Sequence, residues 1–506
     1  MQVCASAKLS RSWVYGAGLV AFLFLFLRHF VLPCVPLAEL GDQLLFFARA
    51  QHILHGSVIY RDFFEVVPPG NDLLDAAILH AFGLHSWVIP AVDVAVGLAM
   101  FAVITLTAAE ILERHWVLLP GMLFLAFVFS ESSDVTHHWY STLAAQAAIY
   151  VLMRGRSARH LAVAGLLCAT SMLFTQTHGA FAFVAIAIYL IWTGHKEGTR
   201  RQLISFVLPC VVLVASVLGY YALRAGWRTL YFDLVVFPAR FMTTSEVNTP
   251  RTYLHQFPAM HAAGDLLRLI PYLFVYALVP YVYIIGAYRL WRGRRELPVD
   301  LRDRMFLLHL MGIALVFAVA NGPRFYRLCT VSPCAVLVFV WLLSGPARSA
   351  RTVRNFAYGV GALFMLLLVV SRQARWHGTL QLPTGRAAFI DRQDAAEFAW
   401  MAAQTHPGDA FFNKTALSLY LALNTPTMVE FINDDEFTRP EQVTAVIAWM
   451  QQNRPRFVVL QPNANLRQEH SNSGPFRQYV QTQYRLARVF SLDGGAQREE
   501  IWERNP

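Results

Sequence analysis

The chain has 506 residues, of which 56% are hydrophobic and only 15% are charged, and its mean hydropathy is +0.42. Such a composition excludes an ordinary soluble protein, whose surface must be wetted, and indicates a membrane protein. The net charge of +10 does not indicate a nucleic-acid partner, because most basic residues lie in short loops between apolar segments.

The apolar segments predict an all-α polytopic bundle of about eleven membrane-spanning helices, since about 20 apolar residues in a helix cross the hydrocarbon. The expected helices are residues 13–32, 87–110, 116–131, 139–153, 160–177, 179–193, 203–223, 266–288, 305–320, 327–344 and 355–371. Basic clusters occur in every second connection, at residues 8–11, 154–159, 196–201, 289–304 and 348–354. By the positive-inside rule we expect a bacterial inner-membrane protein with a cytoplasmic N-terminus and a periplasmic C-terminal segment.

The connection over residues 33–86 is a large first loop on the outer side, and long loops commonly carry function. Apolar residues recur in it at helical spacing, at Leu44, Phe47, Ala48 and Leu54. This pattern predicts a helix over residues 42–54 that lies along the membrane surface, with its polar start facing water or a site. Residues 224–265 form a second long outer connection.

Residues 372–506 have the composition of a soluble domain. Apolar periodicity predicts a helix over residues 395–403, and Thr438 with Glu441 forms a T-x-x-E capping box. Candidate strands alternate with the helices, at residues 410–413, 427–431, 456–460 and 486–490. We therefore expect a small α/β domain on the outer face.

Acidic residues gather in the predicted outer loops, at Glu39, Asp42, Asp62, Glu65, Asp72, Asp75, Glu131, Asp134, Asp233, Glu246 and Asp265. Carboxylates beside a membrane are desolvated, so a group of them on one side suggests a charged ligand, an acceptor or a metal. The alternative is that acidic residues simply occupy the loops from which positive charge is excluded. Asp93, inside a predicted span, is expected to pair within the bundle.

Two segments of the first outer loop resemble a known family. Residues 41–56, G-D-Q-L-L-F-F-A-R-A-Q-H-I-L-H-G, and residues 58–70, V-I-Y-R-D-F-F-E-V-V-P-P-G, resemble the first outer loop of GT-C glycosyltransferases. The branch that they match includes the protein mannosyltransferases, the aminoarabinose transferases of lipid A and the rhizobial lipopolysaccharide galacturonosyltransferases. Residues 137–143, H-H-W-Y-S-T-L, and 174–179, F-T-Q-T-H-G, are similar to the outer ends of helices in this family.

The resemblance implies that Asp42 is the catalytic residue, because family members carry an acidic residue at this place, usually within an Asp-Glu pair. Gln43 replaces the second acid here, which weakens the case for a metal held by two adjacent carboxylates. The pattern Y-x-D-F-x-x-x-x-P-P-G is matched from Tyr60 through Asp62 to Gly70.

The implied reaction is transfer of a sugar from polyprenyl phosphate to an acceptor hydroxyl, usually with inversion at the anomeric carbon. Asp42, with a usual pKa of about 4, would be ionised and could accept the hydroxyl proton. The leaving phosphate needs positive charge, and guanidinium groups bind its oxygens bidentately. The candidates for this contact are Arg61, Arg324 and Arg327, with Arg240 as a fourth; the alternative for each is an ordinary interfacial anchor.

Further polar residues are expected to support the active site or the acceptor, namely Glu39, Tyr60, Asp62, Glu131, Asp134 and His138. With His137, the last three could also supply metal ligands, although two adjacent histidines project from different faces of a helix. Mg²⁺ or Mn²⁺ is left open as a cofactor, and a hydrogen-bonded loop is the alternative interpretation. The six cysteines show no metal-binding spacing.

These features favour a membrane glycosyltransferase that acts on a lipid-linked donor and on a glycan, lipid or protein acceptor at the outer face. One alternative is a transporter or flippase of lipid-linked glycans, which predicts charged or broken helices at mid-membrane; such charges are scarce in this sequence. An O-antigen ligase or polymerase would share the donor class and differ mainly in its acceptor. The start of the first outer loop favours the first interpretation.

Overall fold

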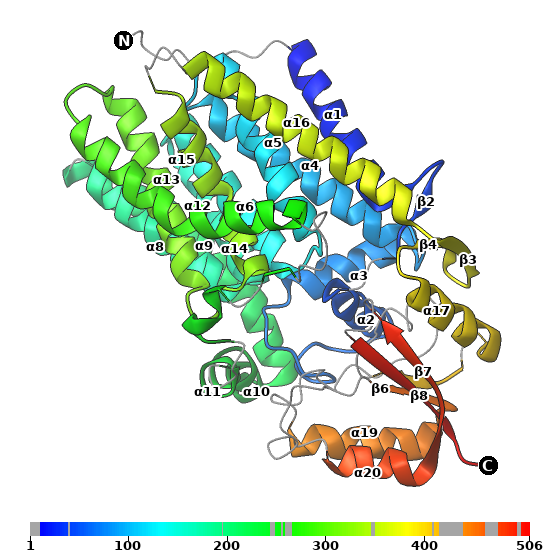
Figure 1. Cartoon of the computed structure of the whole chain (residues 1–506). Helices are drawn as coiled ribbons and strands as arrows, with labels where there is room; N and C mark the ends of the chain where they lie inside the picture. Colours follow the sequence, from blue (N-terminus) through cyan, green and yellow to red (C-terminus); the bar gives the residue numbers. More distant parts are fainter. Residues whose placement is uncertain are drawn as a thin grey trace.

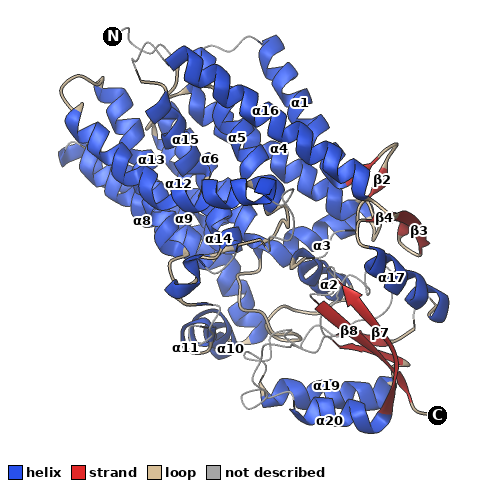
Figure 2. Cartoon of the chain, viewed as in Figure 1, coloured by secondary structure: helices blue, strands red, loops and turns tan. Residues whose placement is uncertain are grey.

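The computed structural model describes residues 11–38, 41–194, 196–242, 248–254, 257–258, 266–345, 350–406, 409–413, 439–460, 474–492 and 497–506. Most helices form one elongated bundle (Figure 1). Figure 2 shows that the larger strands lie at one end of this bundle, beyond the short helices α2 and α3. The chain is therefore a helical bundle that carries a smaller strand-containing cap at one end.

Every predicted span coincides with helical backbone, although the boundaries differ. The bundle consists of α1 (Arg11–His29), α4 (Val88–Ala109), α5 (Leu118–Phe127), α6 (His137–Arg154), α7 (Ala158–Phe174), α8 (Gln176–Thr193), α9 (Lys196–Ala225), α12 (Leu266–Arg292), α13 (Val299–Ala318), α14 (Phe325–Val331), α15 (Pro333–Leu343) and α16 (Ala350–Arg375). The segment predicted at 327–344 is two helices, α14 and α15, bent by 66°. The break falls at Pro333, whose ring cannot continue the hydrogen-bond pattern of the preceding helix.

Six helices in the described part of the chain are long and apolar enough to cross a membrane, or seven if α14 and α15 form one bent span. The six are α1, α4, α8, α9, α12 and α16. By contrast, α5 has only 10 residues, about half the length needed to span the hydrocarbon. The bundle of apolar helices is thus confirmed, while the count of eleven spans stays a prediction.

Ion pairs join several helix ends on the side of the bundle opposite α2 and α3. Glu110, which follows α4, lies 3.1 Å from Arg154 of α6 and 3.3 Å from Arg304 of α13. Arg156 lies 3.4 Å from Asp303. The basic clusters predicted at 154–159 and 289–304 therefore meet at one end of the bundle, as the alternation of basic loops requires.

Inside the bundle, the acidic residue of α4 has a partner. Oδ2 of Asp93 lies 3.7 Å from Nδ1 of His29 at the end of α1, and both side chains are buried. A buried carboxylate is costly unless it is paired, so this contact holds α1 against α4. The prediction that Asp93 pairs within the bundle is confirmed.

The first outer loop contains the strand pair β1 (Phe30–Val31) and β2 (Val35–Pro36), then α2 (Gln43–Leu54) and α3 (Gly70–Phe82). The helix expected over 42–54 is therefore present, and its expected position along the membrane surface stays a prediction, although protein and not lipid covers its apolar face. Leu44, Phe47 and Ala50 are buried in a core shared with α3 and the C-terminal segment. Helical spacing of apolar residues shows that one face is buried, and it does not show whether lipid or protein buries it.

The second long outer connection and two short links are also partly helical. They contain η1 (Arg114–Trp116), η2 (Phe129–Glu131), α10 (Trp227–Tyr231), the π-helical turn η3 (Phe232–Val236), α11 (Phe237–Arg240) and η6 (Pro250–Leu254). Of the acidic residues expected in these loops, Glu246 and Asp265 lie outside the described residues. The described part of the connection lies at the same end of the bundle as α2 (Figure 1).

The C-terminal segment contains a hairpin and a four-stranded sheet. Its elements are β3 (Gly378–Leu382), β4 (Gly385–Phe389), α17 (Arg392–Gln404), β5 (Phe411–Asn413), α19 (Pro440–Asn453), β6 (Phe457–Leu460), α20 (Gly474–Gln483), β7 (Tyr484–Leu492) and β8 (Gln497–Arg504). The sheet order is β5-β6-β8-β7, with β5 parallel to β6 and the other pairs antiparallel. Predicted strands at 410–413, 456–460 and 486–490 match β5, β6 and β7, and the strand predicted at 427–431 lies outside the described residues.

The C-terminal segment and the first outer loop share a core. Backbone N–H groups of Ala38 and Ser86 donate to the carbonyls of Ala388 and Thr384, each at 2.9 Å. Phe389 and Phe398 are buried in the same apolar cluster as Phe47 of α2. Sequence analysis missed the β3–β4 hairpin, and this hairpin makes the contact.

The start of α19 differs from the predicted capping box. The N-cap is Arg439, whose backbone N–H donates to Oε1 of Gln442 at 2.9 Å, and Pro440 occupies the first turn. Thr438 lies outside the described residues. The capping glutamine therefore comes one residue after the predicted Glu441, a shift that is common in assigning helix ends.

Two buried carboxyl groups meet in the C-terminal segment. Glu397 of α17 and Glu499 of β8 are 2% and 3% exposed. Burial, and then the neighbouring Glu499, raises the pKa of Glu397 to about 10, and burial also raises the pKa of Glu499. At neutral pH the folded pair therefore retains a proton, whereas both carboxyls would be ionised in the unfolded chain.

The stability of the segment should fall as pH rises from about 5 to 9. The folded pKa of Glu397 lies above its unfolded value. The contribution of this carboxyl to the free energy of unfolding is therefore complete below the unfolded pKa and is lost as pH approaches 10. Glu397→Gln, which keeps an amide donor for Glu499, should melt at a higher temperature than wild type at pH 8 and show a flatter pH dependence. Thermal melting of the detergent-purified chain tests this, with exposed Glu296→Gln as control; parallel pH profiles for wild type and Glu397→Gln would contradict it.

Candidate functional site

Asp42 stands at the N-cap position of α2, yet its own carboxyl makes no capping hydrogen bond. Asp134 caps the helix instead: its Oδ2 accepts the N–H of Asp42 at 2.9 Å, and its Oδ1 accepts the N–H of Gln43 at 3.0 Å. A Cβ on Gly41 would lie 2.6 Å from Cγ of Asp134. The glycine of the G-D-Q motif is therefore needed for this close approach, and the Asp42 carboxyl is left for other partners.

Three arginines act on the Asp42 carboxyl. Asp42 is open to solvent on one side. Protein atoms nevertheless surround its carboxyl closely enough to remove part of its hydration, and this desolvation raises its pKa. Arg327, Arg49 and Arg324 oppose the rise by attraction, in that order. Arg327 lies in α14 and Arg324 immediately precedes it. The structure thus brings two of the predicted phosphate-binding arginines to Asp42.

Arg49 is a site residue that sequence analysis missed. It follows Asp42 by seven residues, two turns of α2, so both side chains lie on the same face of the helix; this spacing could have revealed it. Its guanidinium forms a buried ion pair with Glu65. Glu65 also accepts the N–H groups of Val66 and Val67, at 2.7 and 3.0 Å. Arg49 is thereby held in place next to Asp42.

Three histidines lie beside these charges; His178 is buried, and His137 and His138 are half-buried. The ring of His138 is 4.0 Å from that of His137 and 5.1 Å from that of His178. Burial lowers the pKa of His138 well below its usual value, so it is neutral at physiological pH. Within the described part of the chain, both ring nitrogens of His178 and the Nδ1 atoms of the other two have no hydrogen-bond partner. His178, which sequence analysis noted only as part of a motif, thus presents free polar atoms.

The histidines are connected to the arginines through aromatic side chains. Tyr326 of α14 lies 6.4 Å from His138, with the guanidinium of Arg327 5.7 Å from its ring centre. Phe46 of α2 lies 5.4 Å from His137. The starts of α2, α6, α8 and α14 therefore meet at one place.

Glu131 is positioned near the same place. It ends η2, which packs against α14, and the carbonyl of the preceding Ser130 accepts a hydrogen bond from Arg28 at 2.7 Å. Glu39 lies outside the described residues. Glu131 is thus fixed between α1 and the helix that carries Arg327.

A metal ion does not fit the described residues. No group of three or more His, Cys, Asp or Glu side chains among them is arranged to hold one. Both oxygens of Asp134 already accept backbone N–H groups, and the rings of His137 and His138 face each other at 4.0 Å. We therefore derive no step of the reaction through Mg²⁺ or Mn²⁺.

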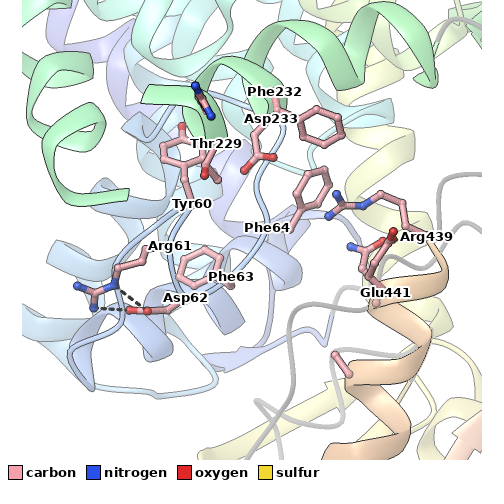
Figure 3. Close-up of a pocket in the computed structure, with 13 residues that line it drawn as sticks. Tyr60, Arg61, Asp62, Phe63, Phe64, Thr229, Phe232, Asp233, Arg439 and Glu441 are labelled. Atoms are coloured by element: carbon pink, nitrogen blue, oxygen red, sulfur yellow. Dashed lines mark hydrogen bonds and ion pairs between the residues drawn. The ribbon is translucent and has the colours of Figure 1, made fainter. Parts of the chain in front are cut away.

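A separate cavity, and not the surroundings of Asp42, contains Tyr60, Arg61 and Asp62. Arg61 donates two hydrogen bonds to Asp62, both at 2.8 Å, and this contact, with the N–H of Val58, lowers the pKa of Asp62 to about 2. The hydroxyl of buried Tyr60 donates to the carbonyl of Val67 at 2.7 Å. All three predicted residues line a cavity of about 570 Å³ whose lining does not include Asp42 (Figure 3).

Arg240, the fourth candidate for phosphate, lies in α11 with its guanidinium 5.7 Å from the ring centre of Phe241. It is not one of the cations that act on Asp42. Of the four arginines proposed from sequence, Arg324 and Arg327 therefore share the surroundings of Asp42. Arg61 is committed to Asp62, and Arg240 lies against an aromatic ring.

No protein-family model and no curated protein matches the sequence, but solved structures share its fold. ArnT from Cupriavidus metallidurans bound to undecaprenyl phosphate is 14% identical, with a TM-score of 0.62 over 98% of each chain. The oligosaccharyltransferase AglB from Archaeoglobus fulgidus, in complex with an inhibitory peptide and a dolichol-phosphate, is 10% identical, with a TM-score of 0.52 over 97% of this chain and 74% of AglB.

The arabinofuranosyltransferase AftD from Mycobacteria is also similar, at 13% identity and a TM-score of 0.51 over 99% of this chain and 40% of AftD. All three are glycosyltransferases of the GT-C type. The chain therefore has the GT-C fold, and the resemblance seen in the first outer loop is confirmed at the level of the fold. These sequence identities are too low to assign the activity or the substrate of any of these proteins to this chain.

Asp134→Ala should destabilise the start of α2, because it removes the acceptor for two backbone N–H groups. Loss of an N-cap acceptor typically costs about 1 kcal/mol, so the variant should melt at a lower temperature than wild type. Hydrogen exchange at Asp42 and Gln43 should accelerate in the same variant. Half-buried Asp391→Ala, which caps α17, serves as the matched control and should change exchange only in that helix. Unchanged exchange at α2 in Asp134→Ala would refute the capping role.

Proposed function

We propose that the chain is a membrane glycosyltransferase that moves a sugar from a polyprenyl-phosphate donor to an acceptor hydroxyl at the outer face of the bacterial inner membrane. The observation that carries this proposal is the arrangement of Arg327, Arg49 and Arg324 around the Asp42 carboxyl in a chain with the GT-C fold. A carboxylate among several cations can act as a base while the cations bind an anion. That combination is what transfer from a sugar phosphate requires.

Asp42 is the proposed general base. The acceptor oxygen attacks the anomeric carbon and forms the new glycosidic bond, while Asp42 accepts the hydroxyl proton. The bond from the anomeric carbon to the phosphate oxygen breaks, its electron pair leaves with the polyprenyl phosphate, and the configuration at carbon inverts. Because Asp134 caps α2 in its place, the Asp42 oxygens are available for this proton.

Arg327 and Arg324 are the proposed phosphate ligands. The leaving phosphate gains negative charge as the bond breaks, and positioned guanidinium groups stabilise that charge. Arg327 is held by a hydrogen bond from its Nη1 to the carbonyl of Gly322 at 3.2 Å. Its buried Nε has no hydrogen-bond partner among the described residues, so this side chain has bonding capacity left for an anion.

The neutral histidines are proposed to bind the donor. His178 and His138 have ring nitrogens without partners in the described chain, and unpaired polar atoms in a buried place are costly unless a ligand or water bonds to them. Sugar hydroxyls and phosphate oxygens could both accept from a neutral imidazole N–H. Lipid phosphates bound to the structural neighbours ArnT and AglB support a polyprenyl-phosphate partner here.

Asp42→Asn should lose transfer by at least about 100-fold, the usual contribution of a general base, while melting at the wild-type temperature. The measurement is sugar transfer by purified protein from a panel of synthetic polyprenyl-phosphate sugars to lipid, glycan and peptide acceptors. Asp409→Asn, at a side chain that is 45% exposed, is a control that should retain activity. Full activity in a folded Asp42→Asn would remove Asp42 from the mechanism, and lipid flipping without transfer in proteoliposomes would replace the enzyme by a transporter.

Transfer should also depend on pH through Asp42. A base must be ionised, and burial raises the pKa of Asp42 above its usual value, so activity should rise with pH through an acid limb centred above about pH 4. Arg327→Gln removes the largest opposing charge and should shift this limb to higher pH as well as weaken donor binding. Arg61→Gln, whose guanidinium is paired with Asp62, should leave the limb in place; an equal shift in both variants would contradict the assignment.

A further inference from the structure

A cavity of about 570 Å³ separates three parts of the chain that are distant in sequence. Figure 3 shows that the first outer loop contributes Tyr60 to Phe64. The helical turns α10 and η3 contribute Thr229, Phe232 and Asp233, and the start of α19 contributes Arg439 and Glu441. This volume falls in the range of roughly 300–1,000 Å³ that is usual for pockets taking small organic ligands. The proposed catalytic residue Asp42 is not part of its lining.

Arg439 reaches into an aromatic cage in this cavity. Its guanidinium carbon lies 4.4 Å from the ring centre of Phe64, 5.5 Å from Phe232 and 5.8 Å from Phe237. Its buried Nε has no hydrogen-bond partner among the described residues, and no carboxylate of those residues forms an ion pair with it within 4.0 Å. The aromatic faces stabilise the cation but give its Nε–H no oxygen acceptor.

Arg228 gives the cavity a second cation. It is exposed, lies on the cavity lining, and has its guanidinium 5.9 Å from the ring centre of Trp227. Within the described chain it likewise has no ion pair, whereas Arg61, the third arginine of the lining, is paired with Asp62. Two of the three guanidinium groups are therefore available to an anion.

The backbone around the cavity adopts two uncommon conformations. Tyr60 has φ +68°, in the left-handed region, and Phe232–Val236 forms a π-helical turn that carries Phe232 and Asp233. Strained residues and π-helical turns both concentrate at functional sites. These features therefore favour a binding role over an accidental gap in the packing.

Charged side chains also connect the cavity to the surroundings of Asp42, the proposed base. Glu65 forms the buried ion pair with Arg49, and Arg49 acts on Asp42. On its other side Glu65 interacts electrostatically with Asp233. The pKa of Asp233, which burial raises, is lowered by Arg439 and raised further by Glu65. A continuous row of charges thus runs from Asp42 to the cavity, and α10 beside it exposes Trp227 and Tyr231, side chains typical of the membrane interface.

We propose that this cavity binds the acceptor through a sugar bearing an anionic group, with Arg439 and Arg228 holding the anion and Phe64 and Phe232 packing on the sugar. Guanidinium groups bind phosphate or carboxylate oxygens bidentately, and the apolar face of a pyranose suits an aromatic ring. The inference rests on the proposed glycosyl transfer and names the acceptor class for it. The donor would occupy the place around Asp42, so the two substrates approach from different sides of Glu65.

The test measures binding separately from transfer. Saturation-transfer NMR on the full chain in detergent would use glucose 6-phosphate as probe, with glucose and inorganic phosphate as matched compounds. Wild type and Asp42→Asn should bind glucose 6-phosphate saturably and equally, and at least tenfold more tightly than either matched compound. Arg439→Gln should weaken binding at least tenfold, Arg439→Lys less, and exposed Arg386→Gln on β4 should not change it.

The outcomes separate this inference from the proposed function. Binding that is unaffected by Arg439→Gln, or equal binding of glucose or of phosphate alone, would overturn the anionic-sugar site even if Asp42-dependent transfer stands. Should Arg439→Gln melt early, Arg228→Gln, an exposed position, carries the same expectation. In transfer assays Arg439→Gln should raise the KM for an anionic acceptor at least tenfold with kcat and the donor KM nearly unchanged, whereas a purely structural anchor would lower the melting temperature and leave KM unchanged.

Discussion

The carboxylate of Asp134 accepts the N–H groups of Asp42 and Gln43, and the rest of the site depends on this contact. An aspartate at an N-cap usually turns its own carboxyl back onto its helix. Because Asp134 does so from a different loop, the Asp42 carboxyl is left among Arg327, Arg49 and Arg324. The close approach needs Gly41, where any Cβ would collide with Asp134. One hydrogen-bonded contact therefore both positions the proposed base and keeps it free.

Glu65 extends this arrangement toward the second cavity. Its ion pair with Arg49 is buried, and removing one partner of such a pair leaves an uncompensated buried charge. The pair therefore fixes α2 against the segment that carries Tyr60 and Arg61. Asp233 and Arg439 continue the row of charges on the far side. The proposed base and the proposed acceptor cavity are thus held by one network, which suits a reaction between two separately bound substrates.

The helices could be predicted closely because apolar length and helical spacing are local properties of the chain. Asp93 could also be expected to pair, since burial of a charge requires it, although His29 as its partner could not be named. What covers the apolar face of α2 could not be predicted, because Leu44 and Phe47 would give the same spacing against lipid as against Phe389 and Phe398. The β3–β4 hairpin was missed, and its Leu382, Ala387 and Phe389 lie in the same apolar cluster as this face.

The sequence by itself determined a bundle of apolar helices, because composition is a property of the chain alone, and the resemblance of its first outer loop to a known family predicted Asp42 as the base. Only the tertiary structure decided which charges surround Asp42. Arg327 and Asp134 approach it from segments far away in sequence, Arg49 reaches it from the same face of α2, and Arg61 is withdrawn by its pairing with Asp62. Electrostatic attraction falls with distance in space, and the helix packing sets that distance.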